Sequence, residues 1–446
     1  MRASRSLTAV LAVAASLAVL PGPPTAAAAG AWSPTRGFTA GPSTSDVVVP
    51  RAAIARDGTS ALAYTTHDGA LMLTTGTANG RFGTPRLIDR SGASDPSVAA
   101  APGGAFLLAW EDADGLHAAV RTKAGRRIVM RRYDSGPISE INGVQVAADP
   151  LGGWVLAQRV FPHGPMRDRL YGVRVLSLDP AGRALGPVQD LGAGEFGIDA
   201  RPTQALAVDG SGRAVLAFTR QAPATGLGLT APVVVATRPH GAMFGAPVAL
   251  PATAPAADPR VAVDEAGRAT VAFTRVASRG DAGAFGAPAL AQVRPDGTLG
   301  DPVGPALRFP QRAFGPSVAL TPGAAVLVFS LKAKSEAFVT EAPVRAVAVG
   351  AGGTVGAVQT LTSARAKEPV AMALSRGRVL AVWSGRRGLG AALATNGRFR
   401  RTAEPKGPPP APYHFNLTNR DLRTAGRYAI FAWAIAGRVR VAVRGF

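Results

Sequence analysis

The sequence predicts an all-β chain folded as a single β-propeller of eight four-stranded blades. Three observations predict this fold: one 15-residue phrase occurs twice, a frame derived from it recurs eight times, and the two chain ends hold complementary fragments of one unit. Repeated units of four short strands are typical of propeller blades, which close into a ring.

The phrase that occurs twice is "LAVDGSGRAVLAFTR" (Leu206 to Arg220) and "VAVDEAGRATVAFTR" (Val261 to Arg275), with ten of fifteen positions identical. Each copy has an alternating apolar stretch, then Asp and Gly, then a second apolar stretch. Asp favours the start of a turn, and Gly accepts the left-handed conformation that a tight turn requires. Each copy therefore predicts two strands joined by a hairpin, with turn residues rather than metal ligands at Asp149, Asp209 and Asp264.

A shorter frame recurs when the phrase is anchored on its aromatic residue. Seven of the eight anchors have a Gly six residues earlier, five have a Pro about 14 residues earlier, and successive anchors are 46 to 60 residues apart, which leaves room for a third and a fourth strand. A ring of seven blades is the alternative, because the units around Gln158 and Trp433 match the frame least well. The anchors are Tyr64, Trp110, Gln158, Phe218, Phe273, Phe329, Trp383 and Trp433.

The ends of the chain complement each other. The 13 residues after Trp433 suffice for a third strand, "RVRVAVR", but not for a fourth. The segment Ala31 to Ala40, "AWSPTRGFTA", resembles a fourth strand with no unit before it. An N-terminal strand that completes the C-terminal blade would remove both open sheet edges. We therefore expect a closed ring rather than a linear solenoid.

The first 29 residues are typical of a signal peptide. Arg2 and Arg5 precede an apolar run from Leu7 to Leu20, and Ala27-Ala28-Ala29 suits signal peptidase. The run has 14 residues, fewer than the roughly 20 that span a bilayer. We therefore expect a signal peptide over 1–29, a propeller domain over 30–446 and a mature chain outside the cell, free or associated with the cell wall. An uncleaved membrane anchor is the alternative.

The chain is strongly basic, with 49 Lys and Arg against 28 Asp and Glu and a formal net charge of +21. Such a charge attracts anionic surfaces such as wall polymers, acidic polysaccharides or nucleic acid. No run of five or more basic residues occurs, so the sequence predicts charge spread over the surface and no specific nucleic-acid site. Non-specific adhesion to an anionic polymer remains an alternative function.

The frame "P-x-V-A-x-D-x-x-G-x-A-x-V-A-F/W" resembles the repeats of sialidase-like and WD40-like propellers that are common among secreted actinobacterial proteins. The resemblance covers nearly all of the mature chain and implies blades, but it specifies no chemistry. A sialidase of that kind usually carries an "RIP" motif and Asp-boxes of the form S-x-D-x-G-x-T-W, and neither occurs cleanly.

Motifs of metal and nucleophilic chemistry are absent from the sequence. The five His residues have no zinc-ligand spacing, and neither a D-x-D-x-D-G loop nor a G-x-S-x-G elbow occurs. The chain has no Cys, so it forms no disulfide and has no thiolate. We expect neither a metal nor a cofactor.

The predicted binding site is the mouth of the central channel, where the inner strands of all blades begin. Its expected residues are Asp95, Arg131, Arg132, Tyr133, Glu140, Arg201, Asp258, Arg260 and Glu368. A ring of mixed charge can hold a sugar, a peptide or a loop of another protein. The leading hypothesis is a monomeric, non-catalytic propeller that binds an extracellular polysaccharide, cell-wall polymer or protein. The alternative is a glycan-active hydrolase or lyase, which requires two or three carboxylates at the mouth.

Overall fold

The computed structural model consists of β-strands and connecting turns throughout its described residues. No helix in this described part is long and apolar enough to cross a membrane. The described residues are 31–41, 50–90, 92–112, 114–122, 128–133, 140–161, 170–195, 204–220, 232–251, 256–264, 266–280, 283–306, 312–332, 342–385, 388–404, 420–435 and 437–446.

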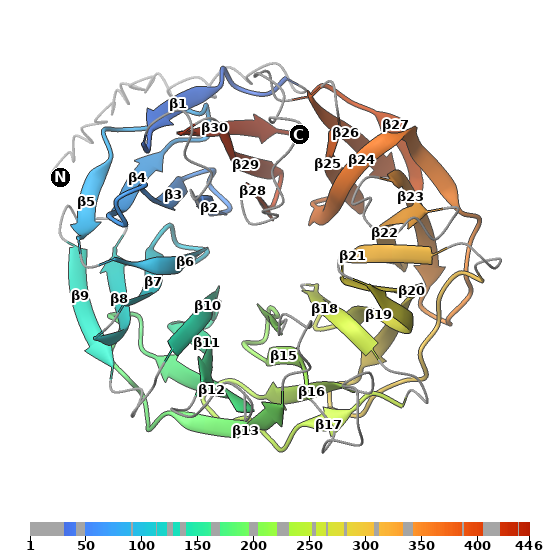
Figure 1. Ribbon diagram of the computed structural model, residues 1–446, viewed down its shortest axis with the longest axis horizontal. Coiled ribbons are helices and arrows are strands. Elements are labelled where there is room, and N and C mark those ends of the chain that lie inside the picture. The colour runs from blue at the N-terminus through green and yellow to red at the C-terminus, as the bar shows by residue number, and fades with distance from the viewer. Residues whose placement is uncertain are drawn as a thin grey trace, which may run out of the picture.

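Eight four-stranded antiparallel blades surround a central channel, which confirms the predicted fold class (Figure 1). Within each blade the strands are numbered here from the channel outward. Blade 1 comprises β2 (Pro50–Ile54), β3 (Ser60–Thr65), β4 (Leu71–Gly76) and β5 (Arg86–Asp89), and blade 2 comprises β6 (Ser94–Ala100), β7 (Phe106–Asp112), β8 (Gly115–Arg121) and β9 (Ile128–Tyr133). Blade 3 comprises β10 (Glu140–Ala148), β11 (Trp154–Phe161), β12 (Leu170–Leu178) and β13 (Gln189–Glu195), and blade 4 comprises β14 (Gln204–Val208), β15 (Ala214–Thr219), β16 (Val233–Arg238) and β17 (Val248–Ala249).

Blades 5 to 7 are joined into one ten-stranded ladder, because β24 (Gln359–Leu374) runs from the outer edge of blade 6 to the inner edge of blade 7. Blade 5 comprises β18 (Ala256–Val263), β19 (Ala269–Gly280), β20 (Gly283–Val293) and an outer edge of isolated bridges at Leu299 and Val303. Blade 6 comprises β21 (Arg312–Thr321), β22 (Ala324–Lys332), β23 (Ala342–Gly350) and the start of β24, and blade 7 comprises the end of β24, β25 (Arg378–Gly385), β26 (Gly388–Thr395) and β27 (Arg398–Arg401).

Blade 8 takes its outermost strand from the other end of the chain, as the sequence predicts. Strand β1 (Arg36–Thr39) pairs antiparallel with β30 (Arg438–Gly445), next to β29 (Tyr428–Ile435) and β28 (Arg420–Ala425) (Figure 1). Trp32 Nε1 also donates a 2.9 Å hydrogen bond to the carbonyl of Ala403, beyond the last strand of blade 7. The N-terminal segment therefore closes the ring.

The eight anchors lie on the second strands and are buried, with at most 4% of any of them exposed. The units of Gln158 and Trp433 are complete blades, which excludes the seven-blade alternative. Because Trp110, Trp383 and Trp433 pack inside the blades, their rings are not available for stacking on a sugar.

Two faces of the ring follow from the repeated strand order. The inner strands begin on one face, here called the channel-mouth face, and the turns between the first and second strands lie on the other, here called the turn face. On the turn face, seven of the frame glycines have φ between +57° and +125°. A residue with a Cβ is strained in this region, which explains the recurring Gly. The glycines are Gly58, Gly104, Gly152, Gly212, Gly267, Gly377 and Gly426.

Candidate functional site

Five of the inner strands carry a β-bulge near the channel-mouth face. In each bulge, two residues of the inner strand lie opposite a single residue of the second strand, which re-aims side chains and interrupts the ladder. The register shifts lie between Ser94 and Ser97 in β6, Ile141 and Val144 in β10, Ala257 and Arg260 in β18, Phe314 and Ser317 in β21, and Lys367 and Val370 in β24.

Three predicted site residues occupy the same position in this repeated bulge. In four strands the second bulge residue is the Pro of the sequence frame, which cannot donate a ladder hydrogen bond and is tolerated at a bulge. The residue before that Pro is Asp95 in blade 2, Asp258 in blade 5, Gly315 in blade 6 and Glu368 in blade 7. The fold therefore brings the backbones of Asp95, Asp258 and Glu368 to equivalent points around the channel. The side chains of Asp95 and Glu368 lie outside the described residues.

Asp258 has an unusual backbone for a residue other than Gly, with φ of +54°. The left-handed region is uncommon for such residues, although Asp tolerates it better than most, and strain of this kind clusters at functional sites. Its neighbour Arg260 is exposed and donates from Nη1 to the Pro259 carbonyl at 3.0 Å. A carboxylate and a guanidinium thus meet at the mouth beside blade 5.

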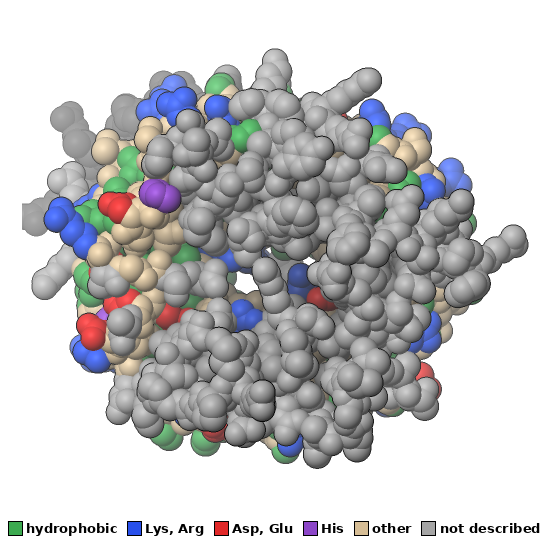
Figure 2. All heavy atoms as spheres, in the orientation of Figure 1, with side chains coloured by type: hydrophobic (Ala, Val, Ile, Leu, Met, Phe, Trp, Pro, Cys, Tyr) green, Lys and Arg blue, Asp and Glu red, His purple; other side chains and the backbone are tan. Residues whose placement is uncertain are grey.

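The central hollow carries charged side chains on its wall. Figure 2 shows Lys or Arg side chains on both sides of the hollow, with an acidic side chain beside one of them. Mixed charge around a concave site is what the sequence predicts for the mouth. Such a wall offers hydrogen-bond donors and acceptors to a polar ligand.

The other predicted residues lie apart from this group. Arg131, Arg132 and Tyr133 are on β9, the outermost strand of blade 2, so the fold does not bring them to the channel mouth. A role in binding stays a prediction for these three side chains, but at the perimeter. Glu140 begins the inner strand β10, although its side chain lies outside the described residues, as does the whole of Arg201.

The structure gives Tyr133 a contact between blades. Its hydroxyl donates a 2.6 Å hydrogen bond to the carbonyl of Gly182 in blade 3, and Arg131 Nε donates to the neighbouring carbonyl of Ala181 at 3.2 Å. Burial raises the pKa of Tyr133 to about 12, against a smaller opposing effect of Arg131. A Tyr nucleophile needs the opposite shift or an adjacent base, so this environment suits packing rather than catalysis.

Sequence reasoning missed a buried carboxylate at the channel-mouth end of blade 2. Glu111 follows the anchor Trp110 on β7, is 0% exposed and pairs across the ladder with Ser94, next to Asp95. Its Oε2 accepts a 3.2 Å hydrogen bond from the N–H of Gly143 in the bulge of β10. The signal available in the sequence is its position, because an acid directly after an aromatic anchor lies at the end of a second strand.

Sequence reasoning also missed a set of contacts between neighbouring inner strands. Four side chains, each on the inner strand of one blade, accept a hydrogen bond from the backbone N–H of the next inner strand. Ser97 accepts from Val146 at 3.1 Å, Gln145 from Leu206 at 2.9 Å, Ser317 from Ala371 at 2.9 Å and Asp421 from Ala52 at 2.9 Å. In the five frames with a Pro, the equivalent residue is the one directly after that Pro.

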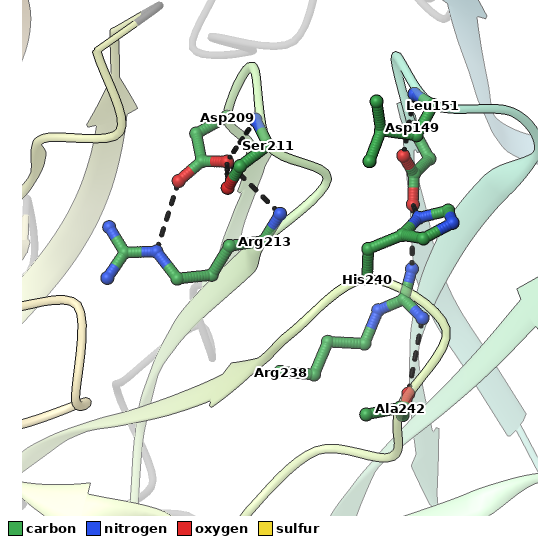
Figure 3. Close-up of polar contacts among 8 residues, drawn as sticks. All are labelled: Asp149, Leu151, Asp209, Ser211, Arg213, Arg238, His240 and Ala242. Carbon is green, nitrogen blue, oxygen red and sulfur yellow. Dashed lines mark hydrogen bonds and ion pairs between the residues drawn. The ribbon is translucent and has the colours of Figure 1, made fainter.

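The Asp residues of the turn face act as turn residues, as predicted. Asp209 Oδ1 accepts from Ser211 N, Ser211 Oγ and Arg213 N, and its Oδ2 accepts from Arg213 Nε at 3.1 Å (Figure 3). Asp264 binds Arg268 N and Nε in the same way. Hydrogen bonds within each hairpin therefore account for these carboxylates.

The Arg of each such turn also joins two blades. Arg213 donates to the carbonyls of Arg294 and Gly267 in blade 5, and Arg268 donates to the carbonyl of Thr321 in blade 6. Asp149 makes the corresponding link differently, since its Oδ2 binds His240 Nδ1 at 2.8 Å and Arg238 Nη2 at 3.4 Å from blade 4 (Figure 3). The turn face is thus occupied by structural contacts.

Metal chemistry finds no support in the geometry. Within the described residues, no group of three or more His, Asp or Glu side chains is arranged to hold a metal ion. The described carboxylates of the turn face are bound by their own hairpins, as shown above.

Comparison with known proteins shows the propeller architecture. No protein-family model matches the sequence, and a search of curated proteins finds no match. Among solved structures, the chain is similar to an α-L-arabinanase of Penicillium chrysogenum complexed with arabinobiose, with a TM-score of 0.44 and 13% identity over 79% of this chain and 93% of that one.

Two further propellers illustrate the range of functions found on this architecture. The Hadza microbial sialidase Hz136 has a TM-score of 0.38 and 13% identity over 72% of this chain and 73% of that one. The Aleuria aurantia lectin AAL, complexed with Fucalpha1-6GlcNAc, has a TM-score of 0.40 and 10% identity over 83% of this chain and 100% of that one. At these identities the likeness concerns the fold alone.

Proposed function

We propose that this chain is exported and, as a monomer, binds a carbohydrate polymer at the channel-mouth face. The observation that carries the proposal is the repeated bulge, which sets acidic residues at one level in blades 2, 5 and 7 and holds Asp258 in a left-handed conformation beside the exposed Arg260. Sugar hydroxyls are both donors and acceptors, so a rim that alternates carboxylates and guanidinium groups suits them.

The contrast between the two faces supports the same proposal. On the turn face the repeated Asp and Arg residues are bound to each other and to the next blade. On the channel-mouth face the equivalent positions differ from blade to blade, from Asp95 and Asp258 to Gly315. A scaffold needs repetition, whereas recognition of one ligand needs different groups at different places.

The experiment is a binding screen of the mature chain against immobilised polysaccharides and a glycan array. Arabinan and fucosylated glycans belong in the panel, because the arabinanase and the lectin described above were crystallised with such ligands. We expect the double variant Asp258→Ala/Arg260→Ala to weaken binding at least tenfold. The matched control is Arg400→Ala/Glu404→Ala, which leaves the net charge equally unchanged and alters exposed residues in and beside β27, at the perimeter of blade 7.

Two results would count against the proposal. One is a parent protein that binds no glycan in the panel, and the other is a double variant that binds the same glycan as tightly as the parent. A cell-fractionation experiment with the full-length chain tests export separately, because retention of an uncleaved chain inside the cell would contradict it.

A second candidate function is a glycan hydrolase or lyase at the same face. The observation in its favour is the pair of acidic residues in blade 2, where the buried Glu111 faces Ser94 across the ladder and Asp95 follows in the bulge. Glycoside hydrolysis uses two carboxyl groups, one as acid and one as base or nucleophile. Release of reducing ends or unsaturated sugars that is abolished by both Glu111→Gln and Asp95→Asn would establish this function. Binding without any product would exclude it.

A further inference from the structure

One position of the inner strands defines a ring around the channel. It lies opposite the residue that precedes each anchor. At four junctions between blades its side-chain oxygen accepts the backbone N–H of the next inner strand, as described for Ser97, Gln145, Ser317 and Asp421. The residues at this position are Arg51, Ser97, Gln145, Ala205, Arg260, Ser317, Val370 and Asp421.

The junctions on both sides of β18 lack such an acceptor. Between blades 4 and 5 the position is Ala205, which has no polar side-chain atom, and between blades 5 and 6 it is Arg260, which has only donors. In the described contacts no side chain accepts from the N–H of Val261 or Val318, the residues that correspond to Leu206 and Ala371. Backbone N–H groups at such places are normally paired with an acceptor.

We infer that the inner ring beside β18 is an oxyanion site, in which a ligand oxygen accepts from a backbone N–H where a Ser, Gln or Asp oxygen does so at other junctions. Arg260 supplies the charge, because its guanidinium is exposed at this ring position and presents several donors to an oxyanion. The inference rests on the proposed function and adds the ligand's class: the bound group is the carboxylate or sulfate of an acidic glycan, or a free oxyanion of the same chemistry.

The donors explain why an anion fits better than a neutral hydroxyl. Two backbone N–H groups and one guanidinium offer only hydrogens, and a carboxylate or sulfate accepts several hydrogen bonds at once. Asp258 is the nearest like charge in the sequence, two residues before Arg260. Its carboxylate opposes anion binding, so Asp258→Asn is expected to strengthen binding of an anion by about threefold to tenfold.

The test uses calorimetric titration of the mature chain with three probes at constant ionic strength: sodium sulfate, oligogalacturonate and an uncharged oligosaccharide of similar length. We expect the parent to bind sulfate and oligogalacturonate. Arg260→Ser is expected to weaken both at least tenfold while leaving the melting temperature no lower. The introduced Ser can accept from Val318 as Ser317 does from Ala371. Arg400→Ala, which removes one exposed positive charge from the perimeter, is expected to change neither.

The outcomes separate this inference from the proposed function. If the parent binds uncharged glycans but neither anion, or if Arg260→Ser binds both anions like the parent, the anion site is wrong and the proposed function stands. If sulfate binds through Arg260 but no saccharide binds, the anion site stands for a free oxyanion and glycan binding is wrong. An equal loss in Arg260→Ser and Arg400→Ala would show general charge attraction and overturn the inference.

Discussion

Two Asp residues of blades 4 and 5 show how differently the faces of the ring use the same residue type. Asp209 on the turn face is buried and accepts four hydrogen bonds, all from Ser211 and Arg213 of its own hairpin. Asp258 on the channel-mouth face is half-buried, sits in a bulge and has a left-handed backbone. The first arrangement stabilises a fold, whereas the second maintains strain that folding alone does not require.

The comparison teaches where this chain can vary without losing its ring. Changes on the turn face are expected to reduce the free energy of unfolding, because each turn also links two blades. Changes at the mouth are expected to alter binding and to leave stability nearly unchanged. The following predictions test this division, from the largest effect on stability to the smallest.

Deleting residues 31–40 should have the largest effect, because it removes β1 and opens blade 8. Trp32 and Phe38 are both buried, at 9% and 8% exposure, and burial of two such side chains contributes about 3 to 6 kcal/mol. The exposed edge of β30 should also promote aggregation. Thermal melting of a chain that begins at Thr44 measures the effect against one that begins at Gly30. Identical melting curves would contradict ring closure by β1.

Substitution of the turn-face glycines should come next, and two of them form a matched pair. Gly212 and Gly267 have φ of +78° and +80°, so Val at either position costs about 1–3 kcal/mol in backbone strain. A Cβ at Gly212 would also lie 2.7 Å from Asp149 Oδ1 and 2.9 Å from His240, whereas at Gly267 the nearest atom is 3.4 Å away.

Gly212→Val should therefore destabilise the protein by more than Gly267→Val, and denaturant unfolding compares the two. An equal loss in both variants would show that the link between Asp149 and His240 adds nothing. A loss below roughly 0.5 kcal/mol in either would show that the turn does not require Gly.

Asp209→Asn should cost about 1.5–3 kcal/mol at pH 7, because it removes the charge from the hydrogen bonds with Ser211 and Arg213. Burial raises the pKa of Asp209, but these hydrogen bonds outweigh it and hold the pKa below 3.8. The folded chain therefore binds this proton less readily than the unfolded chain. The contribution is complete above the unfolded pKa and is lost as the pH falls through the folded pKa.

The difference in unfolding free energy between the parent and Asp209→Asn should accordingly shrink below pH 3.8. Urea unfolding at pH 7 and at a series of lower pH values provides the measurement. A difference that stays constant over this range would show that the Asp209 charge does not contribute to stability.

Asp258→Gly should have the smallest effect, with a change of less than about 1 kcal/mol in either direction, since Gly adopts positive φ without a Cβ. The matched turn-face variant is Asp264→Gly, which loses the hydrogen bonds from Arg268 N at 2.8 Å and Nε at 2.7 Å and should cost about 1.5–3 kcal/mol. Melting curves of the two variants compare the faces directly. An equal loss of stability would erase the distinction between them.

Much of the ring could be predicted because each blade is a local unit. The hairpin at Asp209 and Gly212 involves neighbours within four residues, so turn chemistry and strand alternation indicate it directly. The alternation of the N-terminal segment also predicted β1, because a missing fourth strand at one end and a spare one at the other can be compared without coordinates. The bulges were harder to predict, although a frame Pro preceded by Asp, Glu or Gly marks four of them.

The sequence by itself determined the repeat, the blade number and the strand that closes the ring, because these depend on periodicity and on residues close together in the chain. Only the tertiary structure decided which side chains share the channel. It moved Tyr133 to the perimeter, against Gly182 of the next blade, and set Arg260 at the ring position held elsewhere by Ser97 and Asp421. Those relations join residues some 50 to 370 positions apart, and spacing within one repeat carries no information about which groups meet across a closed ring.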